Sequence, residues 1–370
     1  MGTLNRLAEV QEKRRRLRAL LPSLGLEAVY LKRQSNFAWL TAGGSNTVGI
    51  TLELGVAGLL LTPEREYAVC NNIETPRMRR EEGLEEQGWI LRDFPWYEDG
   101  EPALVRELAG KARLGADHAF PGAADISRQI NPLRYPLTLP EVERYRELGR
   151  LAAQALEDTA RAVRPGDSEC GITGALAARL WENRLDYITI FVAADRRIAE
   201  YRHPISTCER VGERAMLCVN ARRCGLIVSL TRFVQFKPVA AELRRRYDAN
   251  VLIDCTFMAH TVPGRPAVEA LRKGLEAYAC TGFPEEYRLH HQGGAIGYTG
   301  RDYKADFRTE EVVRENQAFA WNPSITGSKS EDTMIATTAG PLILTPPSGF
   351  PTIRQEVDGH VFTRPDILVL

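Results

Sequence analysis

A helical run over residues 141–163 divides this sequence into two regions whose hydrophobic patterns differ. The run has a charged face, and it stops at Arg164-Pro165-Gly166, residue types that end helices. The chain has 370 residues, and a single hydrophobic core stops growing at roughly 250–300 residues. We therefore expect two domains, residues 1–136 and 137–370.

The first region reads as a helix followed by short strands. Leucine and valine recur at helical spacing over residues 4–22, which predicts one amphipathic helix. Four short segments rich in β-branched or aliphatic residues follow, separated by Gly, Pro and Glu: 27–31, 48–54, 56–61 and 66–69. This pattern indicates a small α/β domain.

The second region mixes both periodicities. Helical spacing continues at residues 169–183, 240–258 and 268–281. Alternating or continuous apolar segments predict strands at 211–219, 226–236, 319–325 and 333–337. We expect an α+β domain in which helical pairs cover an antiparallel sheet.

Charge and cysteine usage exclude several classes of partner. The 48 Lys and Arg residues balance 48 Asp and Glu residues, so the charge gives no reason to expect nucleic acid or an anionic membrane. The first twenty residues lack a signal core, and no apolar run reaches the ~18 residues of a membrane span. The seven cysteines are scattered and contain no C-x-x-C pair. We expect a cytoplasmic protein that binds a small molecule or a short peptide.

Five motifs in the second region follow one another in a characteristic order. They are Arg202-His203-Pro204, Gly225 to Arg232, His290 to Gly297, Ala320 to Ile325 and Ser330 to Thr333. This order resembles the creatinase, prolidase, aminopeptidase P and methionine aminopeptidase superfamily, whose fold is called pita-bread. In the first region, Ser35 to Thr41 and the helix opened by Leu139-Pro140-Glu141 resemble the same proteins. The resemblance implies an α+β pita-bread C-terminal domain preceded by a smaller α/β creatinase-type domain.

The same resemblance implies that the usual metal centre has been lost. Family enzymes hold two metal ions through two Asp, one His and two Glu. The corresponding positions here are Cys218, Ser229, Gly294, Asn322 and, as the one retained ligand, Glu331. One carboxylate with a thiol, a hydroxyl and an amide cannot hold two hard cations. We expect no metal and no other cofactor, although a mononuclear site using Cys218, His203 or His291 stays open.

Two residues are the candidate catalytic groups. His203 stands where the resemblance places an active-site histidine, which metal-free creatinase uses as its proton carrier, and its titration range suits that role. The alternative is a structural histidine before Pro204. Glu331 either binds an amine or guanidinium of the substrate or is neutralised by Lys329, which strand alternation places on the same face.

Eight further residues are candidate substrate-binding groups. They are His290, His291, Gln292, Arg301, Arg232, Asn322, Ser229 and Cys218. Strand alternation sends His290 and Gln292 to one face and His291 to the other, so at least one histidine faces the cleft. Cys218 is either a nucleophile activated beside a histidine or, more commonly for a cysteine on a strand, a small buried hydrophobic residue.

Each of the two candidate arginines either binds a ligand or forms a structural ion pair. Arg301 suits a carboxylate or phosphate group, which arginine binds through paired hydrogen bonds, or it pairs with the adjacent Asp302. Arg232 resembles an arginine near the pocket floor of the family. We favour a structural ion pair of Arg232 with Glu331 or Asp332.

Two functional hypotheses follow from these residues. The first is a metal-independent hydrolase of the creatinase and Xaa-Pro aminopeptidase type, which acts on a C–N bond of a small amino-acid-like or guanidino compound. The alternative is a non-catalytic protein that keeps the cleft to bind a peptide or metabolite. A homodimer is expected, because relatives with this N-terminal domain use it to wall off the partner's cleft and a neutral surface does not oppose association.

Overall fold

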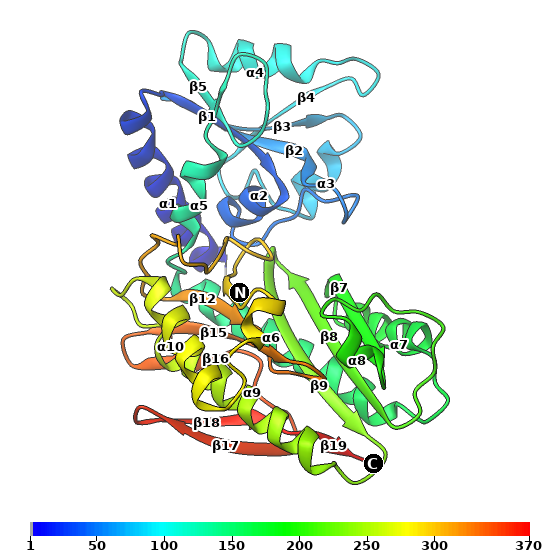
Figure 1. Cartoon of the computed structure of the whole chain (residues 1–370). Helices are drawn as coiled ribbons and strands as arrows, with labels where there is room; N and C mark the ends of the chain where they lie inside the picture. The colour runs from blue at the N-terminus through cyan, green and yellow to red at the C-terminus, as the bar shows by residue number, and fades with distance from the viewer. Residues whose placement is uncertain (1–2) are drawn as a thin grey trace. The chain divides into compact units, whose positions relative to one another are not determined.

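The computed structural model describes residues 3–370, which form two compact units divided between Glu141 and Val142 (Figure 1). Each unit has a hydrophobic core of its own. Among the described residues, no helix combines the length and apolarity needed to cross a membrane.

The first unit is built on one mixed sheet. Its six strands lie in the order β4-β3-β2-β1-β5-β6, in which β2 pairs antiparallel with β1 and β3 while the other pairs are parallel. The strands are β1 (Ala28–Arg33), β2 (Leu54–Leu61), β3 (Glu66–Asn71), β4 (Ile90–Phe94), β5 (Leu114–Ala116) and β6 (Ala124–Asp125). The helices are α1 (Thr3–Leu20), the 3-10 turn η1 (Leu21–Leu24), α2 (Gln34–Leu40), α3 (Thr75–Arg80), α4 (Glu101–Ala109) and α5 (Ser127–Arg134). The expected α/β character of this unit is confirmed.

One strand expected in this unit does not form. Residues 48–53 make turns and bends, and only Leu54 enters β2. Val48 and Leu52 are 66% and 61% exposed, so the segment has no buried face. The prediction of a strand over 48–54 was wrong because β-branched and aliphatic content does not supply the neighbouring strand that a strand backbone needs.

The second unit holds two antiparallel sheets and two strand hairpins. A four-stranded sheet has the order β19-β9-β8-β7, in which only β19 runs parallel to its neighbour, and a five-stranded sheet has the order β11-β10-β12-β15-β16. The longer strands are β7 (Asp186–Ala194), β8 (Arg214–Arg223), β9 (Leu226–Gln235), β12 (Gln317–Trp321), β15 (Asp332–Thr337), β16 (Gly340–Ile343), β17 (Thr352–Val357) and β18 (His360–Pro365). The shorter ones are β10 (Gly293–Ala295), β11 (Tyr303–Lys304), β13 (Ser324–Ile325), β14 (Ser328–Lys329) and β19 (Leu368–Val369).

The helices of this unit are close to those expected. They are α6 (Leu139–Ala162, which begins in the first unit), α7 (Glu169–Glu182), α8 (Arg197–Glu200), α9 (Ala241–Ala259), α10 (Ala267–Cys280) and the 3-10 turn η2 (Glu286–Leu289). α9 and α10 pack against each other (Figure 1). Their close approach requires Gly274, because a Cβ there would lie 2.1 Å from the Phe257 ring. The α+β class expected for this region is confirmed.

Two backbone features bring the motifs together. Thr231 N in β9 donates to Glu331 O at 3.0 Å, which joins the four-stranded sheet to the segment entering β15. In β10, Gly293 and Gly294 have φ values of +104° and +144°, and a Cβ at Gly294 would lie 2.3 Å from the carbonyl oxygen of Tyr303. Only glycine fits Gly294 while β11 keeps this position.

Candidate active site

A small cavity in the second unit collects most of the candidate residues. Its volume is about 260 Å³, the size of a small metabolite rather than of a long peptide. Its walls come from β7, β8, Lys329 in β14, the loop with Arg301, and four of the five motif segments. Six of the ten candidates border it: His203, Cys218, His291, Arg301, Asn322 and Glu331.

A buried ion pair lies in this cavity. Lys329 Nζ lies 2.8 Å from Glu331 Oε2, and both side chains are less than one tenth exposed. Thr231 Oγ1 also donates to Glu331 Oε2, at 2.8 Å. Burial would raise the pKa of Glu331, but Lys329 holds it below its usual range. Burial opposes the charge on Lys329, yet its anionic surroundings hold its pKa above the ordinary value. Of the two alternatives for Glu331, the structure contains the internal ion pair.

The residues around this pair do not suit two metal ions. Lys329 Nζ also lies 3.9 Å from Cys218 Sγ, so one fixed cation reaches two of the five positions at which the resemblance places metal ligands. Burial raises the pKa of the Cys218 thiol, which disfavours the thiolate that binds metals. An ammonium group among the remaining donors adds repulsion to the missing negative charge. The five positions therefore do not fit a dinuclear centre.

Arg301 borders the same cavity without a partner of its own. Its Nη1 is buried and has no hydrogen bond, and the side chain has no ion pair within residues 3–370. Burial lowers the pKa of Arg301, while the carboxylate of Glu331 opposes that shift. A guanidinium with free buried donors is costly unless an anion or water binds it. Arg301 is therefore the strongest anion-binding group of the cavity.

Asn322 has a buried hydrogen-bond acceptor without a partner in the described chain, whereas Arg301 has a buried donor. The backbone N of Asn322 donates to Gln292 O at 3.1 Å, whereas its side-chain Oδ1 is buried without a partner in the described chain. Asn322 and Arg301 both border the cavity, so the site combines an unsatisfied acceptor with an unsatisfied donor. An amino acid or a peptide end carries both complementary groups.

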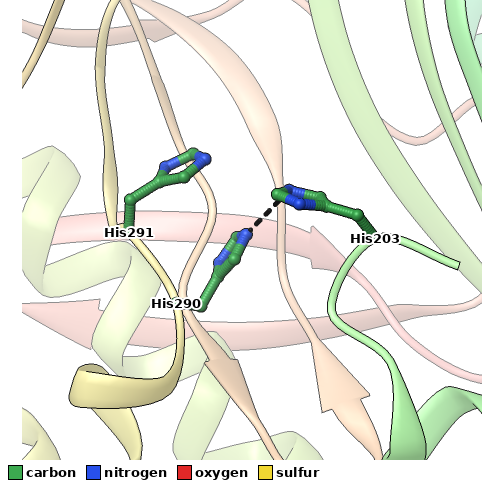
Figure 2. Close-up of side chains that lie close together, drawn as sticks. All are labelled: His203, His290 and His291. Carbon is green, nitrogen blue, oxygen red and sulfur yellow. Dashed lines mark hydrogen bonds between the residues drawn. The ribbon is translucent and has the colours of Figure 1, made fainter.

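Three histidines converge at the edge of the cavity (Figure 2). His203 follows α8, while His290 and His291 follow η2. The Nε2 atoms of His203 and His290 lie 3.1 Å apart, and the rings of His290 and His291 stack at 4.4 Å. One ring nitrogen from each of the three lies within 4.8 Å of the others. These are the side chains of this site that could hold a metal ion.

All three imidazoles are held in the neutral form near pH 7. Burial, followed by the nearby ammonium of Lys329, lowers the pKa of His290 to about 2. Burial and then Arg301 lower the pKa of His291 to about 4. Burial also lowers the pKa of His203, which is the most exposed of the three. A neutral His203 can accept a proton rather than supply one.

Of the two neighbouring histidines His290 and His291, only His291 borders the cavity. Both rings contact His203, because β10 begins only at Gly293 and the two histidines lie in the preceding irregular segment. His291 borders the cavity, and His290 lies behind it against His203. Gln292 also lies outside the cavity wall, so the cavity contacts follow the expected alternation although these residues precede β10.

Gln292, Ser229 and Arg232 lie outside the cavity wall. Gln292 is buried and accepts a hydrogen bond from Tyr278 Oη at 2.8 Å while donating to His290 O at 2.6 Å. Ser229 is fully buried, and its backbone N donates to Thr333 Oγ1 at 2.7 Å. The structure places Gln292 and Ser229 in the support behind the site.

Arg232 lies at the centre of a buried ion network. Its Nε is 3.0 Å from Glu157 Oε1, its Nη1 is 3.0 Å from Asp332 Oδ1, and its Nη2 donates to Thr345 O at 3.0 Å. Arg364 contacts the other oxygen of Asp332, also at 3.0 Å. The structural ion pair favoured for Arg232 is present, with Asp332 as its partner.

Some cavity residues were absent from the sequence-based set. Lys329 was considered only as a partner for Glu331. Phe191 in β7 borders the cavity and lies 5.5 Å from the His203 ring, centroid to centroid. In the ladder, Phe191 pairs with Cys218. Phe191 could therefore have been found only from the register of β7 against β8. Short sequence motifs do not contain that register.

Comparison with known proteins supports the fold. No family model and no curated protein matches the sequence. Among solved structures, the chain is similar to an Xaa-Pro dipeptidase from Bacillus anthracis, with a TM-score of 0.76 and 18% identity over 98% of this chain and 100% of that one. An X-Pro aminopeptidase from Thermotoga maritima has a TM-score of 0.74 and 17% identity over 96% and 99%.

A third similar structure is named for a larger assembly. The N-terminal domain of the FACT complex subunit SPT16 from chickpea has a TM-score of 0.71 and 11% identity, covering 93% of this chain and 97% of that one. These likenesses extend over both units. They confirm the expected pita-bread architecture with its preceding α/β domain.

Proposed function

We propose that this chain, which shares the fold of Xaa-Pro peptidases, binds a small amino-acid-like molecule or short peptide by its carboxylate, without two-metal hydrolysis. The observation that carries the proposal is the buried, unpartnered Nη1 of Arg301 at the cavity wall. A ligand carboxylate satisfies that donor with a charge-assisted hydrogen bond. Asn322 Oδ1 accepts an N–H group of the same ligand.

The ion pair of Lys329 argues against a guanidino or amine group at Glu331. Glu331 Oε2 is already contacted by an ammonium and a hydroxyl, and a ligand cation would have to displace a buried side chain. The charges of Lys329 and Glu331 cancel. With neutral histidines, the charge of Arg301 therefore makes the cavity net positive. A net positive cavity favours an anionic ligand.

We expect Arg301→Gln to weaken carboxylate binding by roughly tenfold to a hundredfold, because a hydrogen bond to a charged group contributes about 1.5–3 kcal/mol. Calorimetric titration with amino acids and dipeptides, alongside their C-terminal amides, measures the effect. The parent protein should prefer the free acids over the amides, and the variant should lose that preference.

The matched control is Arg308→Gln. Arg308 is 92% exposed and contacts only a surface aspartate in its recorded ion pair, so its removal should leave binding unchanged. If the free acids and amides bind the parent protein equally well, or if both variants bind like the parent, the proposal is wrong.

A second candidate function is metal-independent hydrolysis of a C–N bond, with His203 as the proton carrier. The observation in its favour is the 3.1 Å contact between His203 Nε2 and His290 Nε2 at the cavity edge. This contact gives a proton accepted by His203 a second imidazole to interact with. The peptidase names of the fold neighbours favour the same reaction class.

For this candidate, we expect His203→Ala to reduce turnover by ~10²–10⁴ while the thermal unfolding temperature stays close to that of the parent. His203 is exposed, so its removal empties no core. Release of amine from dipeptides measures the rate, with His360→Ala as the control histidine. Full activity of His203→Ala on any substrate that the parent hydrolyses would exclude this mechanism.

A further inference from the structure

We propose that His203, His290 and His291 form a binding site for one divalent transition metal ion, with zinc as the reference ion. This inference concerns donors other than the five positions of the lost dinuclear centre. It also does not depend on carboxylate binding at Arg301, since no residue is shared between the two sites.

The geometry of the three rings is close to that of a metal site. Zinc–nitrogen bonds of 2.0–2.1 Å in a tetrahedral site place ligand nitrogens about 3.4 Å apart. The Nε2 atoms of His203 and His290 are 3.1 Å apart, and the widest separation within the set of three is no more than 4.8 Å. Figure 2 shows the rings pointing into a common space. Closing the widest gap requires a ring movement of little more than about 1 Å.

The donor type selects the class of ion. Imidazole nitrogens suit zinc, copper and nickel, whereas magnesium and calcium require oxygen ligands that this cluster lacks. Three protein ligands leave a fourth tetrahedral position open. His203 and His291 both border the cavity, so the open position is accessible to a water molecule or a small ligand there.

Two features limit the affinity. Lys329 and Arg301 place positive charge near the rings, although Glu331 compensates the first of them. His290 Nδ1 is buried without a hydrogen-bond partner in the described chain, so this ring lacks the outer contact that usually orients a metal-bound histidine. We therefore infer a site that fills when metal is supplied and empties with a chelator.

The ion would join two separate segments. His203 lies between α8 and β8, and the other two histidines lie between η2 and β10. Binding to the folded chain raises the unfolding temperature, and the rise grows with the logarithm of the ratio of metal concentration to Kd. The expected signature is thus saturation at one ion per chain together with a metal-dependent thermal shift.

The experiment must distinguish metal binding at the three histidines from metal binding at cysteine thiols. Cys170 and Cys208 are exposed, and their Sγ atoms lie 3.8 Å apart, so they could bind metal themselves. The full chain carrying Cys170→Ser and Cys208→Ser is stripped with chelator and titrated with Zn²⁺ by calorimetry. A parallel Co²⁺ titration reads the visible absorption of a tetrahedral nitrogen site.

We expect one ion per chain, and a loss of affinity of roughly 100-fold or more in each of His203→Ala, His290→Ala and His291→Ala. His360→Ala, a histidine on β18 far along the chain, should bind like the parent. Arg301→Gln should also keep the metal, which separates this proposal from that of carboxylate binding. Absence of saturable binding, or unchanged affinity in the folded histidine variants, overturns the inference.

Discussion

Replacing Arg232 with Met is expected to lower the free energy of unfolding by about 3–5 kcal/mol, because it leaves buried carboxylates without their cation. The guanidinium contacts Glu157 in α6 and Asp332 in β15 at 3.0 Å each, with all three side chains fully buried. Arg364 still contacts Asp332 after the change, whereas Glu157 loses its closest charged partner. Urea unfolding at neutral pH measures the difference.

The control for this variant is Arg308→Met, which removes an exposed arginine and should change stability by no more than about 0.5 kcal/mol. A stability for Arg232→Met within that same range would mean that the buried network does not hold α6 and the strands together.

The second large effect concerns the ion pair in the cavity. Lys329→Met is expected to cost about 3–5 kcal/mol, since Glu331 is left buried and unpaired. Adding Glu331→Gln removes the orphaned charge, so the double variant should recover most of the loss. A double-mutant cycle of unfolding free energies measures the coupling between the two side chains.

Lowering the pH should affect the stability of the parent and of Lys329→Met differently, because Glu331 is paired only in the parent. In the parent, Lys329 holds the pKa of Glu331 below its usual value, so the stabilisation is present above the unfolded pKa and is lost as pH falls through the folded one. In Lys329→Met, the ammonium no longer offsets the effect of burial, so the pKa of Glu331 should rise. The stability difference between parent and variant should therefore shrink on acidification. A difference that grows with falling pH contradicts the assigned pair.

The sequence predicted helices better than strands, because helices depend mostly on local patterns. Helices expected at 240–258 and 268–281 form as α9 and α10 with bounds within a residue or two, and each is followed by a glycine-containing stop, Pro263-Gly264 or Gly282. The segment 48–54 also looked regular, but a strand needs a partner that the segment itself does not encode. The motif order predicted that Cys218 and Glu331 would share a cavity, and the β9–β15 contact provides the reason.

The sequence could not decide which of several possible partners a site residue contacts in the folded chain. Alternation placed Lys329 beside Glu331, but whether the carboxylate would face its neighbour or a ligand depends on how tightly β14 and the segment after it are buried. Alternation separated His290 from His291, and only His291 borders the cavity, but it did not predict that both rings contact His203. Local patterns describe a segment, whereas these outcomes depend on how distant segments pack.

The backbone around Gly294 limits which side chains this position can hold. The resemblance places a metal-binding histidine there, yet a Cβ would collide with the carbonyl oxygen of Tyr303 at 2.3 Å. Restoring that ligand therefore requires β11 to shift before the histidine can be accommodated, and Lys329 must also leave. Even after both changes, Cys218, Ser229 and Asn322 would still occupy the other ligand positions. Replacing Gly294 alone is therefore expected to disturb the pairing of β10 with β11 rather than to create a metal ligand.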